Sequence, residues 1–75
     1  MSELLFDPPL RLAGDVTVRT LDDAAAFTRN YKTARQPIIR DGVLRRLEGA
    51  SGLEEERNAA NAFRAWIEEE DILRL

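Results

Sequence analysis

Cysteine and histidine are both absent from this sequence of 75 residues. Without cysteine the fold can have no disulfide bond, and no thiolate can hold a metal ion. Without histidine the chain also lacks a common metal ligand and the most frequent general base of enzymes. These absences predict a protein that is not an enzyme and has no metal or cofactor site.

Long apolar runs are missing as well. No segment approaches the roughly 20 apolar residues that span a bilayer, so we expect no membrane contact. The first ten residues carry an acid, Glu3, where a signal peptide has a basic region. The default expectation is a cytoplasmic protein.

The short chain predicts a single domain, residues 1–75, with little stability to spare. A domain of this size buries only about 60% of the surface that its unfolded chain exposes. Small domains often gain stability from disulfides, metals or self-association, and the first two are excluded here. A homodimer is therefore one hypothesis.

Charge is distributed in three blocks along the chain, although the net charge is only −3. Residues 1–28 hold five acids and two bases, and residues 47–75 hold eight acids and three bases. Between them, residues 29–46 hold six bases and one acid. The basic middle could therefore contact an acidic surface.

The N-terminal part predicts an extended arm, residues 1–9, followed by a β-hairpin, residues 10–20. Pro8 and Pro9 force extended backbone and exclude a helix. Apolar residues then alternate with polar ones on both sides of Gly14 and Asp15, which are turn formers. Because a lone hairpin is barely stable in water, it must pack on helices.

Three helices are expected after the hairpin, at residues 21–32, 37–48 and 53–70. Thr20 followed by Asp23 predicts the N-terminus of the first helix, and Ser51 followed by Glu54 predicts that of the third. The tail, residues 72–75, could extend the third helix, with Glu70 facing Arg74, or add a short strand to the hairpin.

The middle segment has two interpretations. Pro37 suits the first turn of a helix, and Asp41 and Arg45 have the spacing of a helical ion pair. Asp41 and Gly42, however, are also a hairpin turn signal between two apolar pairs. We favour the helix, with a start that could fall as late as Asp41.

The predicted fold class is therefore α+β, with the hairpin packed against three helices. The apolar periodicity of these elements also predicts the core. The expected core residues are Leu10, Leu12, Val16, Val18, Leu21, Ala24, Phe27, Tyr31, Val43, Leu44, Leu47, Ala59, Phe63, Trp66 and Ile67.

The loop Gly49-Ala50-Ser51-Gly52 has the G-x-x-G pattern with which some modules clamp a nucleic-acid backbone. Three glutamates, residues 54–56, follow at once and would repel a phosphate there. A helix end followed by a helix start explains the same residues. We therefore assign this loop no ligand.

Four arginines of the basic middle are the candidate partner-binding residues: Arg35, Arg40, Arg45 and Arg46. The first hypothesis is a non-enzymatic protein-interaction or structural module, with a homodimer as one form of it. The alternative is a weak nucleic-acid binder that uses residues 29–46, which the overall negative charge makes unlikely. The sequence does not identify the protein partner.

Several landmarks together resemble a family of small proteins from rhizobia and related bacteria, filed as a domain of unknown function. They are the stretch from Phe6 to Leu10, the Thr20 cap with "DDAAAF", "VLRRLEG" and "AANAFRAW". The resemblance covers about residues 6–70. Tyr31 stands where that family typically has tryptophan, and an arginine replaces a frequent cysteine in the second helix. The resemblance implies a hairpin-plus-helices fold and a bacterial cytoplasmic setting, but no activity and no functional residues.

Overall fold

Two N-terminal strands form the predicted antiparallel hairpin in a computed structural model, which describes residues 5–74. Strand β1 (Leu5–Leu12) pairs with β2 (Val16–Thr20), and Leu12 lies opposite Val16. In the turn between them, Gly14 and Asp15 have φ angles of 82° and 60°. Glycine and aspartate tolerate this left-handed backbone better than most residues, which explains why they stand at the turn.

Strand β1 begins earlier than predicted. The expected extended arm, residues 1–9, becomes part of the strand from Leu5 onward, because Leu5 pairs with Thr20. Between Leu5 and Leu10 the register is irregular. Pro8 and Pro9 lie in this stretch and have no backbone N–H to donate to a ladder. Residues 1–4 of the arm lie outside the described residues.

Three helices follow, and their bounds agree with the predicted ones to within two residues. They are α1 (Leu21–Asn30), α2 (Pro37–Gly49) and α3 (Leu53–Glu69). The hairpin interpretation of the middle segment is wrong, and so is the late start at Asp41. Proline in the first turn loses no hydrogen bond, and Val43 and Leu47 then face the core one turn apart.

The tail forms the short strand β3 (Leu73–Arg74) and does not extend α3. Leu73 lies opposite Leu12, so the sheet order is β2-β1-β3. Asp71, with a φ of 59°, turns the chain out of the helix. The alternative of a helical extension with Glu70 facing Arg74 is therefore wrong, and Glu70 instead contacts the segment before α2, as described below.

The predicted cap of α1 is confirmed, and that of α3 is wrong. The Thr20 hydroxyl accepts the Asp23 N–H at 3.1 Å. At α3 the N-cap is Gly52, with a φ of 88°, and Ser51 caps nothing with its side chain. Instead the Ser51 N–H donates to the Glu55 carboxylate at 3.0 Å. The helix therefore starts one residue later than the serine cap requires.

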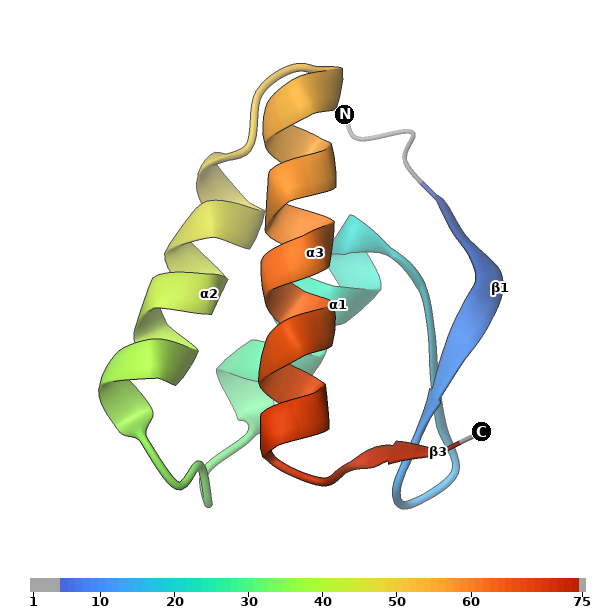
Figure 1. The fold of residues 1–75 in the computed structure, drawn as a ribbon, viewed down its shortest axis with the longest axis vertical. Coiled ribbons are helices and arrows are strands. Elements are labelled where there is room, and N and C mark those ends of the chain that lie inside the picture. Colours follow the sequence, from blue (N-terminus) through green and yellow to red (C-terminus); the bar gives the residue numbers. More distant parts are fainter. Residues whose placement is uncertain (1–4, 75) are drawn as a thin grey trace.

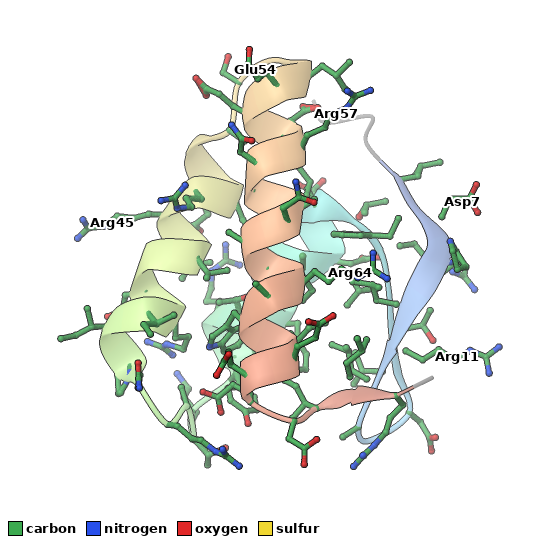
Figure 2. The ribbon with its side chains drawn as sticks, viewed as in Figure 1. Asp7, Arg11, Arg45, Glu54, Arg57 and Arg64 are labelled. Atoms are coloured by element: carbon green, nitrogen blue, oxygen red, sulfur yellow. The ribbon has the colours of Figure 1, made fainter. Side chains whose placement is uncertain are left out.

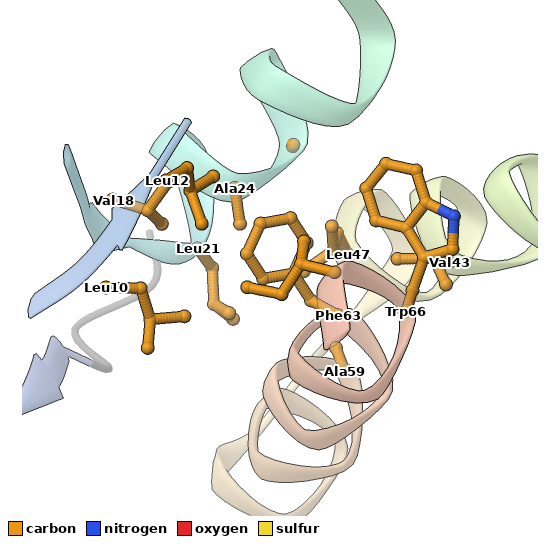
Figure 3. Close-up of a cluster of buried hydrophobic side chains, with 12 residues drawn as sticks. Leu10, Leu12, Val18, Leu21, Ala24, Val43, Leu47, Ala59, Phe63 and Trp66 are labelled. Atoms are coloured by element: carbon orange, nitrogen blue, oxygen red, sulfur yellow. The ribbon is translucent and has the colours of Figure 1, made fainter. Parts of the chain in front are cut away.

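The elements enclose one core. In Figure 1, α2 and α3 run side by side, α1 lies behind them, and the hairpin lies on the other side of α3. Figure 3 shows side chains from the hairpin and from all three helices meeting in this core. Phe63 and Ile67 of α3 are fully buried there. The predicted faces of the hairpin, apart from Val16, and of α3 thus pack as expected.

Four predicted core residues are only partly buried at its edge: Val16, Phe27, Tyr31 and Leu44. The aromatic rings still make a connected group, since the Tyr31 and Phe27 ring centroids both lie within 6.3 Å of that of Trp66. Three residues outside the prediction are buried, namely Ala25, Thr28 and Glu70. Thr28 is satisfied by donating its hydroxyl to the Ala24 carbonyl at 2.7 Å.

Candidate functional site

The structure separates the four candidate arginines. Arg40 turns inward, with its side chain only 21% exposed. Its guanidinium donates to the Tyr31 carbonyl at 2.9 Å and to the Asp41 carboxylate at 2.7 Å. Arg40 therefore ties the start of α2 to the end of α1, and Asp41 pairs with Arg40 rather than with Arg45 as the helical spacing predicted.

A further base of the middle segment is also engaged within the chain. Arg29 on α1 forms an ion pair with Glu48 on α2. Together with Arg40, this leaves two of the six basic side chains of residues 29–46 bonded within the chain, although the Arg29 side chain stays 57% exposed. The remaining candidates, Arg35, Arg45 and Arg46, are exposed.

These three arginines border one continuous feature, which we call the α2–α3 groove. It consists of three adjoining hollows of about 310, 490 and 200 Å³ along the line where the two helices meet. Arg46 borders the first two hollows, and Ile39, Trp66 and Glu69 border the last two. The groove thus extends along most of both helices.

The apolar part of the groove lies near the start of α2. Ile39 lines it and is 48% exposed, and its neighbour Ile38 is 86% exposed. Ala62 and Ala65 of α3 line the same hollow. Ile39 therefore leaves an apolar side chain half exposed inside the groove, and Ile38 adds a second exposed one on the adjoining face of α2.

The two sides of the groove carry opposite charges. All charged lining residues on the α2 side are basic: Arg35, Arg45 and Arg46. All charged lining residues on the α3 side are acidic: Glu55, Glu69 and Glu70. Figure 2 shows Arg45 pointing away from α3, so it borders the groove with its stem. We call these two sides the basic wall and the acidic wall of the groove; they derive from the basic middle and the acidic C-terminal part of the sequence.

Buried polar groups lie at the end of the groove that holds the smallest hollow, of about 200 Å³, which we call its narrow end. Glu70 is 8% exposed, and its carboxylate accepts the Arg35 N–H at 2.9 Å and the Tyr31 hydroxyl at 3.4 Å. The indole N–H of Trp66 is buried and finds no acceptor among residues 5–74. Glu70 thus positions the segment before α2 against the end of α3.

Sequence reasoning missed two features of this surface. Glu70 stands in a run of four acids, residues 68–71, and nothing in the run distinguishes the buried one. Ile39 did carry a signal, because it lies four residues before Val43 and eight before Leu47 on one face of a helix. That face continues beyond the core, which leaves Ile39 at the edge of the groove.

The glycine loop shows no sign of an anion site. The Ser51 N–H is already bonded to the Glu55 carboxylate, and Gly52 serves as the helix cap. Within residues 5–74, no group of three or more metal-ligating side chains converges. In the same range, none of the helices is both long and apolar enough to cross a membrane.

No protein-family model matches this chain, and neither do the curated proteins or the solved structures that were compared with it. The resemblance to the small rhizobial proteins therefore stays a prediction.

Proposed function

We propose that this chain is a non-enzymatic protein-interaction module that forms a homodimer through the α2–α3 groove. The single observation that carries the proposal is Ile39, an apolar side chain that lines the groove and is still 48% exposed, next to Ile38 on α2 at 86%. Covering a large apolar side chain contributes about 1.5–3 kcal/mol when its burial is complete. A contact that covers both isoleucines therefore has a substantial driving force.

The charges of the groove support a second copy as the partner. A surface with one basic wall and one acidic wall is complementary to itself, because each wall can face the opposite wall of a copy. A uniformly acidic or basic partner would be attracted by one wall and repelled by the other. Self-association also supplies the stability that a domain of this size lacks.

The residue content of the groove supports a binding role over catalysis. Its lining offers arginines, glutamates, alanines, asparagine and isoleucine, without histidine or cysteine. Its hollows lie along exposed helix surfaces, whereas substrate pockets enclose most of their ligand. An extended contact with another helix fits such a surface better than a small substrate does.

Nucleic acid is the less favoured partner. Arg29 and Arg40 are engaged within the chain, and the acidic wall lies beside the remaining arginines. Phosphate contacts would give binding that weakens steeply with salt. Salt-sensitive binding of a single-stranded RNA at 50 mM salt, lost in Arg45→Ala/Arg46→Ala, would contradict the proposed preference.

Sedimentation equilibrium tests the homodimer, over protein concentrations from about 10 μM to 1 mM. We expect the wild-type chain to associate into dimers within this range. The variant Ile38→Ser/Ile39→Ser should stay monomeric. Leu53→Ser is the control, because Leu53 is 57% exposed and lines none of the three hollows, whereas Ile39 lines two of them, and it should associate like the wild type.

Two results would overturn the proposal. A wild-type chain that remains monomeric at about 1 mM has no useful self-affinity. A double isoleucine variant that associates as strongly as the wild type places the contact on another face. Circular dichroism of each variant ensures that only folded chains are compared.

A further inference from the structure

We infer that in this dimer α2 of one copy packs on α3 of its partner, with the twofold axis parallel to the α2–α3 groove. This arrangement rests on the proposed homodimer and adds its geometry. The α2–α3 pairs of the two copies then stack face to face as a four-helix bundle, in which each α2 lies over the acidic wall of the other copy. The alternative twofold axis crosses the groove and stacks α2 on α2.

Which residues meet in each arrangement depends on how far along the groove each residue of α2 and α3 lies. At one end of the groove Ile39 shares a hollow with Trp66 and Glu69, and at the other end Gly49 shares a hollow with Glu55 and Asn58. The two helices therefore run in opposite directions, and residues late in α2 lie beside residues early in α3 (Figure 1). Rotation about an axis parallel to the groove does not change the position of a residue along the groove, so residues of the two copies at the same position face each other.

With this axis, opposite charges meet. Arg35 shares the narrow end of the groove with Glu69, so it would lie at the level of the partner's Glu69. Arg46 shares the other end with Glu55, so it would lie at the level of the partner's Glu55. Each attraction occurs twice, because a twofold interface repeats every contact.

With the crossing axis, like charges meet instead. Glu55 and Glu69 lie at equal distances along α3 on either side of Ala62, and this heptad spacing puts all three on one helix face. Stacking α3 on α3 about Ala62 would set Glu55 against the partner's Glu69, twice. Like charges placed opposite each other across an interface disfavour it, so the charges select the parallel axis.

Engineered cysteines can distinguish the two arrangements, since the chain has none of its own. Gly42→Cys and Ala65→Cys place one thiol each on α2 and on α3 within the same hollow. We expect rapid disulfide dimers in an equimolar mixture of the two variants and few in either variant alone. Arg57→Cys mixed with Gly42→Cys gives the background, because Arg57 lies on the side of α3 away from α2 (Figure 2).

The crossing axis predicts the reverse pattern. Residue 42 of one copy would then lie near residue 42 of the other, so Gly42→Cys alone would cross-link faster than the mixture. This outcome would overturn the inference. Cross-linking at background level in all samples, with a dimer still present in sedimentation, would overturn it as well. Absence of the dimer itself would reject the proposed function first, so the two failures are distinguishable.

Glu69→Arg provides an independent measurement with opposite expected signs. In the parallel arrangement, the new arginine faces the partner's Arg35, and we expect the dimer dissociation constant to rise roughly tenfold. In the crossing arrangement, it faces the partner's Glu55, and the dimer would tighten. Arginine suits the last turn of a helix, so the substitution itself should not unfold α3.

Discussion

At the scale of single residues, Arg40 and Glu70 show how charged side chains organise this small fold from within. Arg40 donates to the carbonyl that ends α1, and Glu70 accepts a backbone N–H from the segment that precedes α2. Both therefore hold the connection between α1 and α2, residues 31–36, which has no regular structure of its own. Charged groups in such positions satisfy backbone groups that would otherwise lose water without a partner.

Replacing Glu70 with alanine should destabilise the domain by about 1–3 kcal/mol, because the Arg35 N–H and the Tyr31 hydroxyl lose their acceptor. Urea unfolding followed by circular dichroism measures the change. Glu68→Ala is the matched control on the exposed side of the same helix turn, and it should change stability by less than about 0.5 kcal/mol. Equal effects of the two substitutions would show that Glu70 has no special role.

At the scale of elements, the starts of α1 and α3 follow one local rule. In each helix the acid at the third helical position reaches back to the N–H of the residue before the cap. Asp23 accepts from Arg19 at 3.1 Å, and Glu55 accepts from Ser51 at 3.0 Å. The cap residue itself differs, since Thr20 contributes its hydroxyl while Gly52 contributes only its backbone conformation.

Two glycines of the α2–α3 pair should respond to alanine in opposite directions. Gly52, with φ 88° and ψ 159°, has a backbone conformation that is essentially confined to glycine, so Gly52→Ala should cost about 1–3 kcal/mol. Gly42 lies inside α2, and a methyl group there would meet no atom within 4 Å. Gly42→Ala should therefore stabilise the domain by about 1 kcal/mol.

Urea unfolding at low protein concentration, where the dimer does not contribute, measures both glycine variants. Since the added methyl group meets nothing within 4 Å at either position, any difference in sign comes from the backbone alone. Destabilisation by both substitutions would mean that α2 does not run continuously through Gly42.

At the scale of the whole molecule, the fold turns blocks of charge in the sequence into facing surfaces. The basic middle becomes α2 and the segment before it, and the acidic C-terminal part becomes α3, packed alongside. The accessible surface is 5339 Å², and a typical stable interface takes roughly 800 Å² from each partner. A dimer through one face would therefore cover roughly one seventh of this surface.

A dimer of this kind makes thermal stability depend on protein concentration. Each tenfold increase in concentration adds about 1.4 kcal/mol per dimer, or roughly half of that per chain. For a domain of this size we expect Tm to rise by roughly 3–6 °C per tenfold where the dimer dominates. Scanning calorimetry at several concentrations checks this, with Ile38→Ser/Ile39→Ser as the variant whose Tm should stay constant.

The sequence by itself determined the hairpin and two of the three helices of this protein. Alternation around Gly14 and Asp15 predicted the hairpin, and apolar spacing predicted α1 and α3 with their buried faces. Both follow from local backbone geometry, because side chains return to the same face every 2 residues in a strand and every 3.6 residues in a helix. The Thr20 cap was predictable for the same reason, since its partner Asp23 is three residues away. The α+β class followed from these local patterns.

Tertiary structure decided what depends on distant neighbours. Whether residues 37–47 formed a helix or a hairpin depended on which side chains the rest of the chain would cover, and the tail became a strand only because β1 offered a free edge. The burial of Glu70, the inward turn of Arg40 and the α2–α3 groove likewise arise from segments far apart in the sequence. Local propensity carries no information about such contacts, since each depends on where another element comes to lie.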